Sequence, residues 1–272
     1  MGQWRARMSS RVRTTAEEHH TNFARLVAVR SVPGVVLLIL WQVAYASDLV
    51  SRLVLPGPGG VLHAMVVGLS GGGGWWVHIG VTLEETVIAF VSGSIAALLL
   101  GAVFALFKTM RDSVLPYVVA VQNFPKIAIA PLLVTWLGYG LAPKVVIGAL
   151  LAFFPVLINT IAGLREIGED ELELFRSLRA TPFQEFLYLR IPNALTYIFP
   201  ALTLAAVGSL LGVIVGEFVG SRAGLGYLIL QQTFAGDIAA TYGTLMILAV
   251  IGVGIFYFLK LVERRTKFSR DR

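Results

Sequence analysis

The sequence predicts an all-α membrane protein with about six transmembrane helices and a charged amphipathic loop on one side of the membrane. Hydrophobic residues make up 56% of the 272 residues and charged residues 14%, whereas about 25% of the residues in soluble domains are charged. The apolar residues form continuous runs, and a helix needs roughly 20 such residues to cross a bilayer. Continuous runs also argue against a transmembrane β-barrel, whose strands alternate apolar and polar residues over about ten positions.

Six apolar segments are expected to cross the membrane as helices, because a span in lipid must satisfy its own backbone hydrogen bonds. The remaining chain divides into an N-terminal arm, a charged loop, an outer segment and a basic tail. The predicted spans are residues 31–50, 79–107, 113–137, 143–163, 192–216 and 241–262. The predicted divisions are the arm at 1–30, the transmembrane domain at 31–262 with its loop at 165–191 and outer segment at 217–240, and the tail at 263–272.

The basic residues predict the orientation of the chain. Most of the 22 lysines and arginines lie in the two tails and in the loops after the second and fourth spans. Because cytoplasmic loops are rich in these residues, both termini are expected in the cytoplasm. The opposite loops carry Arg52, Lys144 and Arg222, and Lys126 falls within a span. An odd number of spans would place one arginine-rich tail outside, so six spans are favoured.

The first span has an alternative interpretation as a signal peptide. The apolar stretch that follows Arg30 ends in Ala44-Tyr45-Ala46, a small-x-small pattern similar to a signal-peptidase site. The preceding tail is long for a signal peptide and contains Glu17 and Glu18. A retained span is therefore favoured.

No motif in the chain predicts catalysis or the binding of a cofactor or metal. The sequence has no cysteine, which excludes disulfides and thiolate metal sites. It has no GxxxxGK[ST] phosphate loop, no HExxH and no GxSxG. The basic residues cluster beside apolar spans, which argues for membrane lipid rather than nucleic acid as their partner. We expect that the chain is not an enzyme and that any ATP hydrolysis belongs to a partner.

The loop after the fourth span combines dense charge with helical periodicity. Ten charged residues lie between Arg165 and Arg190, too many for the hydrocarbon core. Apolar residues recur there at largely helical spacing and predict a pair of short amphipathic helices, broken at Thr181-Pro182. Thr181 is expected to cap the second helix, with Pro182 as its first residue and Glu185 in its first turn. Such a helix lies on lipid, packs on its own bundle or enters a groove of a partner.

This loop resembles the cytoplasmic docking loop of ABC importer permeases, which reads Glu-Ala-Ala, a glycine six residues after the Glu, and Ile-x-Leu-Pro. Glu173 begins the first element, the last reads Leu189-x-Ile191-Pro192, and the spacing is intact. The departure is Arg179, which stands where the family has its turn glycine. If the backbone there requires a positive φ, arginine costs about 1 kcal/mol or more. The resemblance implies an ATPase-docking surface of Glu173, Leu174, Phe175, Arg179, Ala180, Thr181, Pro182, Phe183, Phe186, Ile191 and Pro192.

Three further segments, at 123–140, 152–164 and 216–229, resemble the nitrate, sulfonate and taurine branch of these permeases. TLEET at 82–86 is nearer to importers of the pyrimidine precursor of thiamine. The resemblance implies a type I importer permease fold with a coupling helix and a re-entrant outer loop at 217–240. It also implies a homodimer in the bacterial inner membrane, two ATP-binding cassette subunits and an extracytoplasmic binding protein. The implied solute is a small anionic or aromatic compound, such as nitrate, a sulfonate, a pyrimidine precursor, a riboflavin-like compound or an aromatic carboxylate.

Several polar residues fall within apolar spans. Lys126 lies between Pro125 and Pro131, where it either meets a solute or stabilises a helix break. Glu217 either contacts solute or, as we favour, caps a helix or pairs with Arg222. The other polar residues are candidates for interhelical hydrogen bonds. The predicted translocation-pathway residues are Lys126, Gln122, Asn123, Asn159 and Glu217.

Glycines recur every fourth residue along the fifth span, at Gly208, Gly212, Gly216 and Gly220. They form a smooth stripe on one helical face, which lets another backbone approach closely. Helix packing is the expected role, and in a dimer the stripe is a candidate for the subunit or gate interface.

Two functions of other classes stay open. An ion-coupled secondary transporter would need no ATPase and would contain inverted repeats and paired intramembrane carboxylates. Neither feature is clear, and only Glu84, Glu85 and Glu217 are available as such carboxylates. A membrane scaffold would show no solute flux that depends on Lys126.

Overall fold

The computed structural model describes residues 32–47, 50–51, 54–71 and 74–268. All regular structure in these ranges is helical. The chain forms two compact units, Met1–His63 and Ala64–Arg272. In the first unit, the helix Val32–Ala46 is followed by the start of α2 (Pro58–Leu69), and Trp41 Nε1 donates to the Pro56 carbonyl at 2.9 Å.

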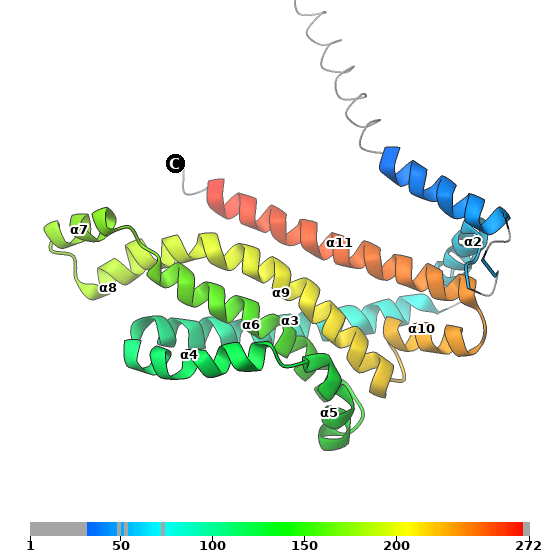
Figure 1. Cartoon of the computed structure of the whole chain (residues 1–272), viewed down its shortest axis with the longest axis horizontal. Helices are drawn as coiled ribbons and strands as arrows, with labels where there is room; N and C mark the ends of the chain where they lie inside the picture. Colours follow the sequence, from blue (N-terminus) through cyan, green and yellow to red (C-terminus); the bar gives the residue numbers. More distant parts are fainter. Residues whose placement is uncertain (1–31, 48–49, 52–53, 72–73, 269–272) are drawn as a thin grey trace, which may run out of the picture. The chain divides into compact units, whose positions relative to one another are not determined.

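Three long helices form the centre of the second unit. They are α3 (Trp75–Leu106), α6 (Leu141–Arg165) and α9 (Ile191–Gly220), which pack along one another (Figure 1). Small residues at their contacts bring the backbones close, as is typical of helices in membranes. A Cβ added at Gly93 of α3 would lie 2.5 Å from the Ala149 carbonyl of α6.

Two groups of shorter helices lie at opposite ends of this centre (Figure 1). At one end are α7 (Glu169–Ser177) and α8 (Pro182–Glu185). At the other end, α10 (Leu225–Phe234) packs against α3, α9 and α11 (Ile238–Phe268). A buried apolar cluster that includes Trp75, Leu210, Leu225, Leu228 and Ile247 holds this end together. We call the two ends the α7–α8 end and the α10 end.

Four helices of the described residues are long and apolar enough to cross a membrane, and a bent pair raises the number to five. The bent pair is the predicted span 113–137. It consists of α4 (Lys108–Gln122) followed by the short 3₁₀ helix η1 (Lys126–Ile129) and α5 (Ala130–Leu137), with a bend of 77°. Prolines 125 and 131 explain the break, because proline lacks a backbone donor. The helix Val32–Ala46 is shorter than the other spans, so the count of six stays a prediction.

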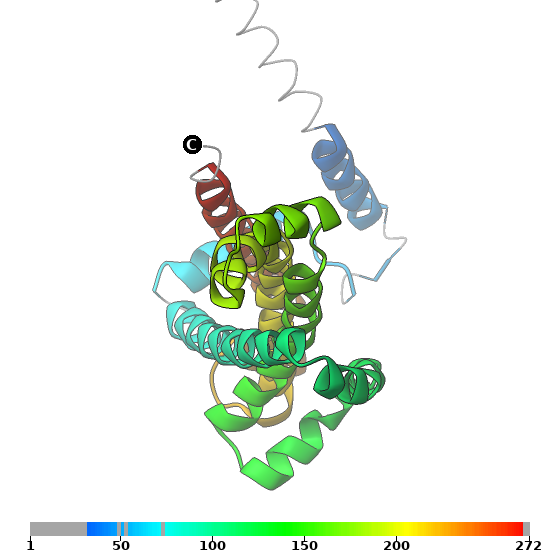
Figure 2. The same cartoon turned by 90° about the vertical axis from the view of Figure 1, so that its left-hand side faces the viewer.

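The loop between α6 and α9 differs from its prediction in one respect. The expected second short helix does not end before Pro192. Instead α8 continues through a π turn, η2 (Phe186–Arg190), directly into α9, so that one helix runs over Pro182–Gly220. The Ile191 N–H bonds to the Phe186 carbonyl, and this wider turn accommodates a proline inside the helix. In Figure 2, which faces the α7–α8 end, α7 and α8 lie in front of α6 and α9.

Candidate functional site

The segment 178–181, here called the elbow, joins α7 to α8 by a tight reversal. The Ala180 N–H donates to the Phe175 carbonyl at 3.0 Å and the Arg179 N–H to the Arg176 carbonyl at 2.9 Å. These two bonds form a Schellman motif, which needs a left-handed residue and usually has glycine there. Arg179 takes that conformation, with φ 54°, and is the only non-glycine residue with positive φ in the described ranges. The strain expected of an arginine at this position is therefore present.

Thr181 begins the next helix as the sequence predicted. Its hydroxyl accepts from the Gln184 N–H at 3.3 Å, and its own N–H donates to Gln184 Oε1 at 2.8 Å. This reciprocal pair is a capping box. Pro182 follows as the first residue of α8, and Glu185 lies in the first turn. The predicted cap is thus confirmed.

Most of the predicted docking residues lie on or beside the elbow. Leu174 and Phe183 are 57% and 71% exposed, and Leu178 is 68% exposed. Glu173, Arg179, Thr181 and Pro182 are also exposed. The remaining predicted residues, Phe175, Ala180, Phe186, Ile191 and Pro192, are half-buried. The elbow and the adjoining turns of α7 and α8 therefore present large apolar side chains to their surroundings, with charged residues beside them.

Three polar side chains, which we call the α6–α9 clamp, bind the helix that follows the elbow to the end of α6. Arg190 pairs with Glu185 and donates to the Leu164 carbonyl at 3.1 Å. Asn193 donates to the carbonyls of Gly163 and Glu166 at 3.0 and 2.7 Å. Tyr197 donates to the Glu166 carboxylate at 2.7 Å. The clamp satisfies two of the carbonyls at the end of α6, those of Gly163 and Leu164, which have no intrahelical partner. It also fixes the helix that follows the elbow to α6.

A second polar site is buried at the α10 end, around Glu217. This residue is 1% exposed, accepts from the Thr82 hydroxyl at 2.7 Å and accepts from the Gly226 N–H at 2.5 Å. The Leu225 N–H donates to Thr82 Oγ1 at 2.7 Å, and the Gly224 N–H donates to His78 Nδ1 at 3.0 Å. Three consecutive N–H groups at the start of α10 are therefore satisfied by α3 and α9 side chains.

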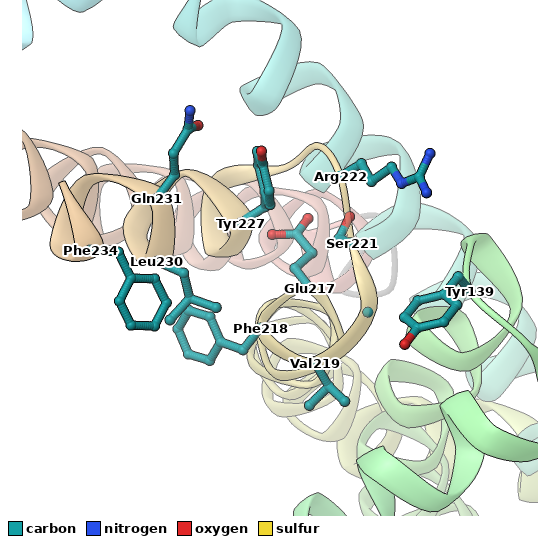
Figure 3. Close-up of a pocket in the computed structure, with 11 residues that line it drawn as sticks. Tyr139, Glu217, Phe218, Val219, Ser221, Arg222, Tyr227, Leu230, Gln231 and Phe234 are labelled. Atoms are coloured by element: carbon teal, nitrogen blue, oxygen red, sulfur yellow. The ribbon is translucent and has the colours of Figure 1, made fainter.

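Glu217 thus caps α10, which is one of the two roles favoured from the sequence. The other was an ion pair with Arg222, and no such pair occurs among the described residues. A Cβ on Gly224 would lie 2.1 Å from Glu217 Oε1, so glycine is required for the carboxylate to reach the loop. A cavity of about 510 Å³ opens beside this loop, and Figure 3 shows Tyr139, Tyr227 and Phe234 around it.

Lys144 occupies a different place from the one expected. The sequence analysis counted it in an outer loop, but it lies near the start of α6 with its side chain 6% exposed. Its ammonium pairs with Glu85 of α3 and donates to Ser221 Oγ at 3.2 Å. Glu85 Oε2 is buried and accepts no hydrogen bond within the described residues. Charges of opposite sign in two apolar spans are the sequence signal that could have predicted this pair.

Comparison with known proteins identifies the family. Residues 90–268 match the family described as "Binding-protein-dependent transport system inner membrane component". The chain belongs to this family. A probable ABC transporter permease protein of Haemophilus influenzae is 31% identical, over 86% of this chain and 94% of that one. The riboflavin transport system permease protein RibX of Chloroflexus aurantiacus is 32% identical, over 84% of this chain and 85% of that one.

Two further similarities agree with this result. The formylaminopyrimidine transport permease protein ThiX of Halalkalibacterium halodurans is 30% identical, over 84% of this chain and 90% of that one. A solved structure of the MetNI methionine ABC transporter in inward-facing conformations aligns with a TM-score of 0.59 at 21% identity. That alignment covers 68% of this chain and 92% of the solved chain. At this identity, the similarity concerns the fold alone. The protein is an ABC transporter permease of the branch that the sequence resembled.

The predicted pathway residues of this permease fall into separate places. Lys126 donates to the Gln122 carbonyl at 2.5 Å and lies 4.6 Å from the centre of the Phe154 ring. These contacts are those expected of a lysine that stabilises a helix break, one of the two roles considered for Lys126 from the sequence. Asn123 and Asn159 donate to carbonyls one turn earlier in their own helices, at 2.9 and 2.8 Å, rather than across to other helices. Among the described residues, no hydrogen bond or ion pair joins Glu217 to this group.

The glycine stripe of the permease faces α6 and α5 of the same chain. A Cβ on Gly212 would lie 2.7 Å from Gly148 Cα, and one on Gly216 would lie 2.8 Å from Lys144 Cα. An added Cβ would lie 3.3 Å from the Leu151 carbonyl oxygen at Gly208 and 3.0 Å from Val134 Cγ2 at Gly220. The close approach that these glycines allow is therefore made within one subunit.

Proposed function

We propose that this permease forms the solute path of an importer together with a second copy of itself, and that two ATPase subunits dock on its elbows. Both termini and the elbow then lie in the cytoplasm, in agreement with the basic residues of the tails and loops. An extracytoplasmic binding protein delivers solute at the α10 end. ATP binding and hydrolysis take place on the partner subunits.

The single observation that carries the proposal is the rigid connection between the elbow and the membrane helices. The helix Pro182–Gly220 runs without interruption from the exposed Phe183 into the centre of the bundle. The α6–α9 clamp ties its first turns to α6. A displacement of α8 by a partner is therefore transmitted to two core helices together. Rigid-body movement of this kind is a recognised route for switching between conformations.

For the solute, we propose a small anionic or aromatic compound. The relatives named for riboflavin and formylaminopyrimidine support an aromatic solute. Two further relatives support an anion: the putative aliphatic sulfonates transport permease protein SsuC of Bacillus subtilis, 28% identical, and the taurine transport system permease protein TauC of Escherichia coli, 26% identical. We propose Lys126 as the cation on this path, and Gln122, Asn123 and Asn159 as polar residues along it. Glu217, by contrast, accepts hydrogen bonds from Thr82 of α3 and Gly226 of α10 with its two oxygens. We therefore propose that it shapes the outer end of the path and does not contact the solute.

The docking function is tested by the double variant Glu173→Lys/Ala180→Asp in proteoliposomes that contain the whole transporter. Charge reversal on α7 and a new carboxylate on the elbow oppose the docking of the ATPase. Solute uptake is expected to fall by at least about tenfold, the factor that corresponds to about 1.4 kcal/mol of docking free energy. The matched control is Glu169→Lys, which makes the same charge reversal one turn earlier in α7 and is expected to keep most of the uptake.

Wild-type uptake by the double variant would refute docking at the elbow. Uptake that persists in the wild-type chain with no ATPase present would instead favour the ion-coupled secondary transporter. The two readouts therefore separate a wrong docking surface from a wrong class of transporter.

A further inference from the structure

We propose that Arg179 is a specificity residue of the docking surface, whose guanidinium pairs with a carboxylate beside the ATPase groove that receives Leu178 and Phe183. The inference rests on the docking function proposed above and adds one contact to it, between Arg179 and an acidic residue of the ATPase. It concerns an arginine at the position where the docking loops that this segment resembles have glycine.

The first observation is the strained backbone of Arg179. The Schellman motif at the end of α7 places this residue at φ 54°, a conformation that glycine adopts without steric cost. Asparagine also tolerates it better than arginine does. Unfavourable backbone conformations of this kind cluster at functional sites. A long cation at this position therefore calls for a role of its side chain.

The second observation is the charge around the elbow. Arg179 and Arg176 are both exposed and neither forms an ion pair within the described residues. The first turn of α7 is acidic instead, with Glu169, Asp170 and Glu171. The end of α7 that leads into the elbow is therefore positive, whereas the first turn of α7 is negative.

This arrangement favours a protein groove over an anionic lipid surface. A lipid surface would attract the arginines but repel the three acidic residues less than three turns away. A groove can instead place a carboxylate opposite the elbow alone. Next to the arginine, Leu178 and Phe183 are 68% and 71% exposed, and a partner must cover them for the apolar contact to contribute. Arginine binds a carboxylate through two parallel hydrogen bonds, which gives this contact directional specificity.

The test uses variants in which the stability of the chain and its affinity for the ATPase are expected to change in opposite directions. Arg179→Gly and Arg179→Asn relieve the backbone strain and remove the charge. Both are expected to unfold at a higher temperature than the wild type in detergent. Both are also expected to retain less ATPase when the whole transporter is purified from its membrane, by roughly three- to tenfold, as for the loss of a well-placed ion pair.

Two controls separate charge from general effects. Arg179→Lys keeps the cation and the strain and is expected to retain more ATPase than the glycine variant. Arg264→Gln removes one exposed cation from the end of α11 and is expected to match the wild type. Raising the salt concentration should reduce ATPase retention more steeply for the wild type than for Arg179→Asn, because salt screens an ion pair.

Equal or better ATPase retention by the glycine and asparagine variants would overturn the inference and leave the docking function intact. A wild-type chain that retains no ATPase would overturn the docking function, and this inference with it.

Discussion

Replacing Lys144 with methionine is expected to destabilise the permease by about 3–5 kcal/mol, the usual cost of removing one partner from a buried ion pair. Methionine keeps most of the lysine stem but leaves the Glu85 carboxylate buried without a counter-charge. One oxygen of that carboxylate already lacks a hydrogen bond in the described structure. Few interactions therefore remain to stabilise its charge once the ammonium is removed. The measurement is equilibrium unfolding of the detergent-solubilised chain.

The control is the double variant Lys144→Met/Glu85→Leu, which removes both charges. Buried ion pairs are often replaced by apolar residues of similar volume at little cost, so most of the lost stability should return. If the single and double variants are equally unstable, the pair has no role beyond packing and our description of this site is wrong.

Replacing Gly224 with alanine is expected to cost about 3 kcal/mol or more, from backbone strain and overpacking together. Gly224 has φ 111° and ψ 164°, a region that is almost closed to other residues. Its added Cβ would also lie 2.1 Å from Glu217 Oε1. The carboxylate would have to leave the start of α10, which holds this segment to α3. The same unfolding measurement reports the loss.

Gly236→Ala is the matched control, because Gly236 has φ 76° and nothing within 4 Å of an added Cβ. It is expected to show the backbone cost alone. A second comparison places Gly224→Ala in a Glu217→Ala background, where the clash is absent. The alanine should then cost less than in the wild type, since residues in contact are not additive. Equal costs in the two backgrounds would contradict the close approach.

Local features of the elbow could be predicted from the sequence, whereas its connection to the membrane could not. Thr181 caps α8 through Gln184, three positions later, and Pro182 is the first residue of that helix. A cap formed over so few residues can be predicted from the local sequence. The glycine expected at position 179 marked a left-handed turn, and Arg179 adopts it. The predicted fifth span begins at Pro192, whereas a π turn joins this residue to α8 in one continuous helix. Such a turn leaves no signal in composition.

The buried polar sites depend on contacts between distant segments. Lys144 and Glu85 are 59 positions apart, and Thr82 and Glu217 are 135 apart. No local pattern pairs such residues, and the position of Lys144 near the end of an apolar run made it look like a loop residue. The glycine stripe showed that a backbone approaches α9, but the sequence could not say that the approaching helix is α6 of the same chain. Whether the approaching helix belongs to the same subunit or to a second one depends on the packing of the folded chain.

The most direct test of the central claim uses the absence of cysteine from this sequence, which makes single-cysteine crosslinking in native membranes unambiguous. One variant carries Leu178→Cys at the elbow, and its control carries Phe234→Cys, an 86% exposed position on α10 at the opposite end. Crosslinked products are identified by mass spectrometry. We predict that the elbow variant captures an ATPase with a nucleotide-binding motif at one copy per permease and that the α10 variant does not. Failure of the elbow variant to capture an ATPase, or capture by the α10 variant alone, would contradict the account.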